Sequence, residues 1–232
     1  MRNKIKISTE FAYVVGMVVI AIGTALITKA NIGVNIVVAP AYILHLFLIS
    51  KGLEFFTFGV CQYIVQGVLV FLVALVCKKF KISYLFAFVS AVLEGYLLDI
   101  FLYLIPDINS ILWMVIYYVS GQIILAIGIS FMLQTYITPE VYELAVVEFI
   151  DAFTDSQSPK AVTAVKVIYD CSIGVLSIIL SFILFGFGNI QGLGIGTIVN
   201  VVIAGYLIGL FTKVQRHLFI YHDSFNLRKY FK

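Results

Sequence analysis

The segment "YVVGMVVIAIG" (Tyr13–Gly23) occurs twice in this chain. It returns without a gap as "YVSGQIILAIG" (Tyr118–Gly128), with Tyr, Val, Gly, Ala, Ile and Gly in the same places. Farther along, "EGYLLDIF" (Glu94–Phe101) returns as "AGYLIGLF" (Ala204–Phe211). A repeat of this kind indicates two related halves. We therefore divide the chain into a first repeat at 1–107, a second repeat at 108–215 and a basic tail at 216–232.

The two glycines in each copy of the first segment are seven residues apart, which places them on one face of a helix. Small residues on one face allow helix backbones to approach closely inside a membrane. Gly16 with Gly23, and Gly121 with Gly128, therefore predict that the first span of each half crosses the other near the axis that relates the halves.

The composition places both halves in a membrane. Of 232 residues, 62% are hydrophobic and 12% are charged, and the mean hydropathy is +1.09. Such a chain has too little polar surface to cover a soluble globule. Six apolar windows are long enough to cross about 30 Å of hydrocarbon as helices, and none alternates like a β-barrel strand. They are Phe11–Thr28, Phe56–Cys77, Tyr84–Ile105, Ile111–Leu133, Ala161–Gly186 and Leu193–Thr212. The sequence therefore predicts an all-α, polytopic integral membrane protein.

The positions of the basic residues predict the topology. They cluster before the first window, between the second and third, and after the last: Arg2, Lys4, Lys6; Lys78, Lys79, Lys81; Lys213, Arg216, Arg228, Lys229, Lys232. Six spans with both termini in the cytoplasm place all three clusters inside, as the positive-inside rule favours. We expect a bacterial inner (plasma) membrane, with Lys51, Asp107 and Asn189 near the outer side. No DNA-binding motif accompanies the clusters, so nucleic acid is not an expected partner.

Each half also holds a short segment that is not a clear span, at 35–50 and at 139–153. The second carries Glu140, Glu143, Glu148 and Asp151. Each acid costs roughly 2.5 to 3.5 kcal/mol near the centre of a bilayer, so this segment cannot cross in contact with lipid. If both segments are re-entrant or half-membrane helices, each half has three spans and the halves point in opposite directions. That arrangement is an inverted repeat. The alternative count of eight spans would place Lys78, Lys79 and Lys81 outside.

Lys166 and Asp170 lie four residues apart inside an otherwise apolar window, where they can pair on one helix face. An ion pair at that depth must face away from lipid. The first half has Gln62 and Gln66 in the equivalent places, also four apart. These residues predict a polar site in the shared interior. The alternative is that they only fasten helices together, at about 0.6 kcal/mol per hydrogen bond.

Glu94 lies near the middle of its window, and no basic residue lies on the same predicted helix. A carboxylate in a low dielectric is driven toward its neutral form. Glu94 is therefore the best single candidate for a proton-coupling or cation-binding group, the alternative being a structural acid. We predict a substrate-binding set of Glu94, Lys166, Asp170, Gln62, Gln66, Glu143 and Asn200.

Three further segments carry a family resemblance: "KANIGVNIVVA" (Lys29–Ala39), "TYITPEVYELA" (Thr135–Ala145) and "GLGIGTIVN" (Gly192–Asn200). With the spaced glycines, they make nearly the whole chain resemble the YitT/YczE family of bacterial multi-spanning membrane proteins. The resemblance implies a multi-spanning helical membrane fold and the transport of small molecules. The aromatic–acid pair typical of the family is kept as Tyr142 and Glu143, whereas the first half has Val37 and Val38.

These features favour a small secondary transporter or permease with a polar site between the halves. Its acids outnumber its one base, Lys166, which predicts a cationic or zwitterionic solute or coupling to protons; an anion held by Lys166 and helix N-termini stays an alternative. The alternative class is a non-transporting binding or regulatory subunit that acts with a partner protein. No catalytic constellation or metal-ligand spacing is present in the sequence, and we expect neither enzyme activity nor a cofactor. The expected partners are lipid, a small solute or ion, and a second copy in a homodimer.

Overall fold

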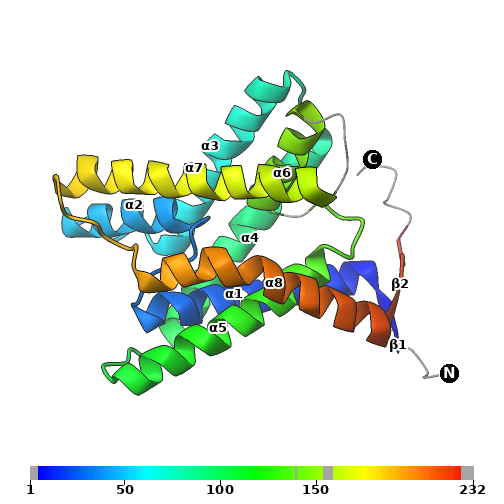
Figure 1. Cartoon of the computed structure of the whole chain (residues 1–232), viewed down its shortest axis with the longest axis horizontal. Coiled ribbons are helices and arrows are strands. Elements are labelled where there is room, and N and C mark those ends of the chain that lie inside the picture. The colour runs from blue at the N-terminus through cyan, green and yellow to red at the C-terminus, as the bar shows by residue number, and fades with distance from the viewer. Residues whose placement is uncertain (1–4, 139, 154–158, 226–232) are drawn as a thin grey trace.

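The computed structural model describes residues 5–138, 140–153 and 159–225. Arg2 and Lys4 of the first basic cluster, Pro139 of the second short segment, and Arg228, Lys229 and Lys232 of the tail lie outside the described residues. Within the described part, the chain forms eight helices and one pair of short strands (Figure 1). Their bounds are β1 Ile5–Ser8, α1 Thr9–Ala30, α2 Ala39–Ser50, α3 Phe58–Cys77, α4 Ile82–Leu104, α5 Ile111–Met132, α6 Val141–Phe153, α7 Pro159–Phe185, α8 Ile195–Leu218 and β2 Phe219–His222.

Six of these helices are long and apolar enough to cross a bilayer: α1, α3, α4, α5, α7 and α8. The shortest has 20 residues, which corresponds to about 30 Å at 1.5 Å per residue. Large apolar side chains such as Phe71, Tyr103 and Val202 lie exposed on their outer surfaces. In a membrane this surface contacts lipid. The prediction of an all-helical, multi-pass membrane protein is confirmed, with each predicted window lying within a few residues of a helix.

Local sequence fixes where several of these helices begin and end. The Ser8 hydroxyl accepts a hydrogen bond from the backbone N–H of Phe11 at the start of α1, at 3.2 Å. The Thr57 hydroxyl does the same for Val60 at the start of α3, also at 3.2 Å. These side chains satisfy donors that a helix leaves unpaired in its first turn. At the other end, α1 stops at Asn31, which has a left-handed φ of 53°.

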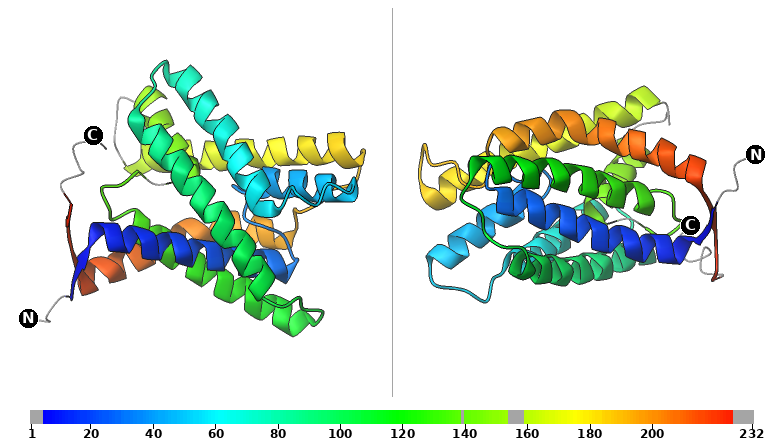
Figure 2. Two further views of the ribbon diagram at one scale, coloured as in Figure 1. Left: turned by 180° about the vertical axis from the view of Figure 1, so that it is seen from behind. Right: turned by 90° about the horizontal axis from the view of Figure 1, so that it is seen from below.

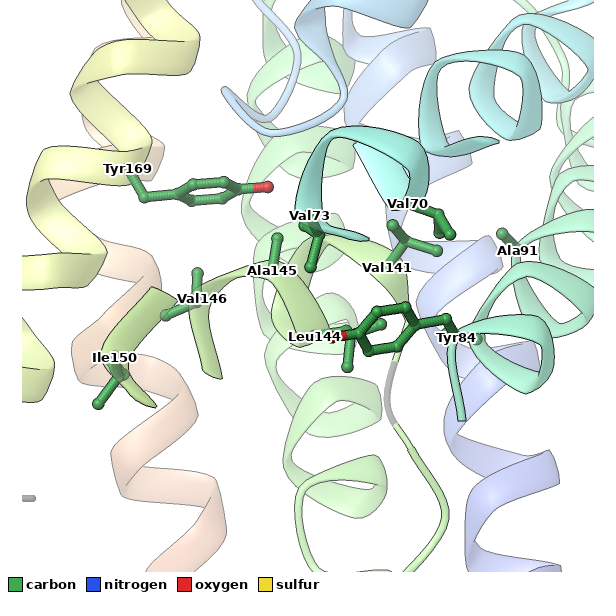
Figure 3. Packing of buried hydrophobic residues seen from close by; sticks show 11 residues of the cluster. Val70, Val73, Tyr84, Ala91, Val141, Leu144, Ala145, Val146, Ile150 and Tyr169 are labelled. Carbon is green, nitrogen blue, oxygen red and sulfur yellow. The ribbon is translucent and has the colours of Figure 1, made fainter. Parts of the chain in front are cut away.

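The short helices α2 and α6 have 12 and 13 residues. At 1.5 Å per residue they extend about 18 to 20 Å, less than the thickness of the hydrocarbon. α6 is enclosed by protein: Val141, Leu144 and Ala145 pack into a cluster with Val73 of α3 and Tyr84 of α4 (Figure 3). One acid of α6, Glu148, pairs with Lys81 at 2.5 Å between Oε1 and Nζ. A segment with this many acids is thus held by protein contacts.

The most extensive helix contact among the described residues is the seam between α1 and α5 (Figure 2). A Cβ atom on Gly23 would lie 2.6 Å from the backbone nitrogen of Leu125, and one on Gly128 would lie 2.8 Å from the carbonyl oxygen of Gly16. A Cβ atom on Gly121 would lie 2.9 Å from the carbonyl oxygen of Gly23. Glycine is required for backbones to approach this closely. The predicted crossing of the first spans at their glycine faces is confirmed.

The two halves make matching contacts around this seam. α1 packs against α4 as α5 packs against α8, and α3 packs against α6 as α7 packs against α2. The hydroxyl of Tyr13 donates to Ser90 Oγ at 2.7 Å and to the Thr138 carbonyl at 3.1 Å. Its repeat counterpart, Tyr118, donates to the carbonyl of Gly196. Two contacts have no match among the described residues: α3 packs along α4 and α4 touches α6, whereas α7 with α8 and α8 with α2 do not pack closely.

The two ends of the described chain meet at one end of the molecule. β1 pairs with β2 in parallel, with Ile5 opposite Phe219 and Ser8 opposite His222. Just inside this pair, the Glu10 carboxylate accepts hydrogen bonds from the Tyr136 hydroxyl at 2.7 Å and the Phe225 backbone at 2.9 Å. Because α1 begins where α8 ends, the number of membrane crossings is even, as six spans require.

Replacing Gly23 by Ala should weaken the α1–α5 seam, because the added methyl group meets the Leu125 backbone. Overpacking of this kind costs about 1–3 kcal/mol. The control is Gly209→Ala on α8, where nothing lies within 4 Å of the added atom. Thermal unfolding in detergent should show a lower midpoint for Gly23→Ala and no loss for Gly209→Ala. Equal midpoints would contradict the seam.

The six-span topology predicts the labelling of single cysteines in a protein whose three native cysteines have been replaced. Lys51→Cys, just after α2, should react with an impermeant maleimide added to intact cells. Lys79→Cys, between α3 and α4, should react only after the cells are opened. Both positions are exposed, so lack of reaction reports the side of the membrane. Labelling of position 79 from outside would exclude this topology.

Candidate functional site

A cavity of about 470 Å³ lies among α5, α6, α7, α8 and the segment that precedes α2. Six polar side chains line it: Asn35, Gln122, Glu143, Lys166, Asp170 and Asn200. The other lining residues are mostly apolar and come largely from α8. A concave, mostly apolar cavity with a few convergent polar groups is the usual form of a small-molecule site.

The segment before α2 is hydrogen-bonded to the start of α8. The backbone of Gly196 donates to the carbonyl of Ile32 at 2.8 Å, and the Thr197 hydroxyl donates to the carbonyl of Val34 at the same distance. Gly33 has φ of +118°, and a Cβ atom there would lie 2.7 Å from the Thr197 hydroxyl. Only glycine fits this conformation and this contact. These contacts fix the segment that places Asn35 at the edge of the cavity.

Asn200 and Gln122 form one wall of the cavity. The Asn200 side-chain amide donates to Gln122 Oε1 at 2.8 Å and thereby joins α8 to α5. Both side chains are buried. The Nε2 group of Gln122 has no hydrogen-bond partner among the described residues. An unsatisfied buried donor is costly, so a ligand that offers an acceptor here gains affinity.

The charged groups of the cavity come from α6 and α7. Lys166 Nζ lies 3.6 Å from Asp170 Oδ1, as their spacing on one helix predicts. The Asp170 side chain is 14% exposed, whereas the Lys166 side chain is 41% exposed. Glu143 lies in the first turn of α6, where the helix dipole favours a negative charge. The cavity therefore holds two carboxyl groups and one ammonium group.

The other predicted site residues form a second polar group, which does not line this cavity. Gln62 Nε2 donates to Glu94 Oε2 at 2.6 Å and joins α3 to α4. Gln66 Oε1 accepts from the backbone of Val141 at 3.3 Å and so caps the start of α6. All three side chains are almost fully buried. The predicted set is thus divided: Glu143, Lys166, Asp170 and Asn200 line the cavity, and Glu94, Gln62 and Gln66 lie in the interior beside α6.

Glu140 belongs to this interior group, although it is absent from the set predicted from the sequence. Its carboxyl group lies within hydrogen-bonding reach of that of Glu94, and its side chain is 5% exposed. Burial raises the pKa of Glu140 well above its usual range, and the nearby charges of Glu94 and Glu143 raise it further. Two carboxyl groups in contact cannot both be ionised at low cost. The pair is therefore suited to hold and release a proton.

Asn35 and Gln122 are also missing from the predicted set. Gln122 carried a signal, because it is a polar residue in the middle of an apolar window. Glu140 lies in a segment whose four acids are evident in the sequence, but the sequence does not show which of them lies beside Glu94. Asn35 carried none, since an asparagine before a helix is common.

The geometry defines a multi-pass helical membrane protein with a charged cavity between its helices. The chain matches the model of a family described as "Family of unknown function (DUF6198)" over residues 7–213, and it belongs to that family. No curated protein matches the chain, and neither does any solved structure.

Lys166→Met should destabilise the protein by roughly 1–3 kcal/mol, because it leaves Asp170 without its counter-ion while the partial exposure of Lys166 limits the loss. Asp170→Leu should have a similar effect. The double variant should lose less than the sum of the two, as measured by thermal unfolding in detergent. Lys213→Met, at an exposed position on α8, serves as the control for removal of a positive charge. Additive losses would show that the two groups are not coupled.

Proposed function

We propose that this protein is a small secondary transporter that binds a cationic or zwitterionic solute in the cavity between its two halves. The observation that carries the proposal is the placement of Lys166, Asp170 and Glu143 in one cavity between helices that span a membrane. Charged groups inside a membrane are costly and typically mark the path of a substrate or ion. The excess of one carboxyl group over the ammonium group favours a ligand that carries positive charge.

The matching contacts of the two halves support an inverted repeat. The Gly16–Gly128 and Gly23–Gly121 contacts are exchanged when each glycine is replaced by its repeat counterpart. A twofold axis between two antiparallel helices produces this pattern. In the same view, α2 and α6 are half-membrane helices that enter from opposite sides, and the substrate site lies between the halves. The resemblance to the YitT/YczE family supports the same assignment, because it implies transport of small molecules.

We place both termini in the cytoplasm of a bacterial cell, on the charge asymmetry of the loops. Lys78, Lys79 and Lys81 then lie on the same side as the paired strands β1 and β2. In this orientation the even number of crossings and the positive-inside rule agree.

Proton coupling follows from the interior group. Glu94 and Glu140 share a buried environment, and Glu143 is one helical turn from Glu140 and faces the cavity. A cation that binds beside Glu143 favours the release of a proton from the pair, since positive charge nearby stabilises carboxylates. Substrate and proton thereby compete for the same negative charge, which is the thermodynamic basis of exchange.

Glu94→Gln should remove proton coupling while the cavity still binds its solute. The test uses proteoliposomes that contain a trapped pH indicator and receive a panel of small cations and zwitterions, including choline, glycine betaine and putrescine. Wild-type protein should move protons with at least one compound, whereas Glu94→Gln should exchange that compound without proton movement. The control is Glu54→Gln, at an exposed position between α2 and α3.

Two results would overturn these assignments. Proton movement of wild-type size in Glu94→Gln would leave Glu94 a structural role only. The panel also includes amphiphiles that carry cationic or zwitterionic head groups. Failure of every compound to exchange through wild-type protein would remove the transporter assignment itself.

A further inference from the structure

The two halves differ most at one helix pair. In the first half, α3 and α4 are closed against each other: a Cβ atom on Gly95 would lie 2.8 Å from the carbonyl oxygen of Gly59, and Gln62 bonds to Glu94. The carboxylate of Asp99 adds a bond from the Gly59 backbone at 2.8 Å. Each of these α4 residues has a small counterpart on α8, namely Ala204, Gly205 and Gly209. The groups that close the first pair are therefore absent from the second.

The α7–α8 pair is open at the corresponding place. A Cβ atom on Gly205 or on Gly209 would have nothing within 4 Å. The cavity reaches this opening, because Val167 of α7 and Val202 and Tyr206 of α8 line it. The same three residues are 52%, 74% and 74% exposed on the outer surface of the helices. All three lie within spans, so the cavity opens sideways into the hydrocarbon of the bilayer.

The cavity has one polar side and one apolar side. Glu143, Lys166 and Asp170 supply charges from α6 and α7, whereas Val202, Gly205 and other small or apolar residues supply the wall on α8. A purely polar solute would leave the α8 wall uncovered, and a purely apolar one would leave three charged groups without partners. The occupant that matches both sides has a charged head and a hydrocarbon chain.

We propose that the substrate is a zwitterionic amphiphile that enters from the bilayer between α7 and α8. This inference rests on the proposed function and specifies its substrate class. The positive group of the head lies against the carboxylates of Glu143 and Asp170, and its negative group lies against Lys166. The hydrocarbon chain passes over Gly205 into the lipid, where the absence of a side chain leaves room.

The charges favour a zwitterion over a head of one sign. An anionic head would meet two carboxyl groups for one ammonium group, and a cationic head would leave Lys166 facing a positive charge. A second copy of this chain is a poorer occupant of the opening, because its apolar helix surface would cover Lys166 and Glu143 without pairing them.

The test measures binding to the full chain in dodecyl maltoside micelles, by native mass spectrometry and by the shift of the unfolding midpoint. The probes are lysophosphatidylethanolamine, phosphoethanolamine, which has the same head without a chain, and lysophosphatidylglycerol, which has an anionic head. Lysophosphatidylethanolamine should bind saturably and at least tenfold more tightly than either of the others. Lys166→Met should weaken the binding of both lysolipids and should enlarge the preference for lysophosphatidylethanolamine, because the anionic lipid loses the one group that pairs with its phosphate and still meets two carboxyl groups.

Gly205→Leu tests the opening itself, and Gly209→Leu is its matched control. Both glycines lie in open space on α8, and leucine favours a helix more than glycine does, so both variants should fold. Only Gly205 lines the cavity. Gly205→Leu should weaken lysophosphatidylethanolamine binding at least tenfold, whereas Gly209→Leu should bind like the wild type.

Three outcomes would overturn the inference. Equal binding by Gly205→Leu and Gly209→Leu would show that the amphiphile does not use this opening. Binding of phosphoethanolamine as tight as that of the amphiphile would mean that the substrate comes from water, which leaves the transporter assignment intact. A dimer that Gly205→Leu dissociates would mean that a second copy fills the opening. Because binding in micelles requires no transport, none of these results depends on the proteoliposome experiment.

Discussion

At the centre of this protein two helix backbones touch, where Gly16 and Gly23 of α1 meet Gly128 and Gly121 of α5. Lipid surrounds apolar side chains as favourably as another helix does, so association inside a bilayer depends on close contact between surfaces. The glycine faces provide that contact. α4 then packs on α1 and α8 packs on α5, while the short helix α2 packs against α3 and α7, and α6 packs against α3, α4 and α7. Among the described residues, the other close helix contacts between the halves are those of α6 with α3 and α4 and that of α2 with α7.

The two halves share much of their helix arrangement but have different side chains at equivalent positions, and the function we propose depends on that difference. Where the first half has Gln62 and Glu94, which bond across α3 and α4, the second half has Lys166 and Ala204. The small residue on α8 cannot reach α7, so that helix pair stays apart and a cavity remains. The closed pair joins the amide of Gln62 to the carboxyl group of Glu94, whereas the open pair leaves Lys166 and Asp170 at the cavity. The cavity lies at the helix pair where the contacts of the two halves differ.

Much of this fold could be predicted from the sequence. The spans follow from apolar windows that are too long and too hydrophobic for a soluble protein. The α1–α5 seam follows from glycines seven residues apart. The pairing of Lys166 with Asp170 follows from helical spacing alone. These features are local, or repeat a local pattern, so a single chain reveals them.

The arrangement of the site is less accessible, because it depends on contacts between distant segments. Glu94, Gln62 and Gln66 were expected in the cavity with Lys166, yet they lie beside α6 with Glu140. No spacing in the sequence reveals which side of α6 a residue of α3 or α4 faces. The open α7–α8 pair was not predicted either: the repeat alignment shows Ala204 and Gly209 in place of Glu94 and Asp99, but not that these acids hold the first pair closed.

The position of the seam in the chain also has a consequence for biosynthesis. α1 leaves the ribosome before its partner α5, which is made only after α2, α3 and α4. Until then the glycine face of α1 lacks the helix that it contacts in the final structure. The strand pair extends this delay, because β1 at the start of the described chain waits for β2, which follows the last span. These contacts therefore cannot form in the order in which the helices are made: α1 meets α5 only after three other helices have followed it, and β1 meets β2 only after α8 has been made.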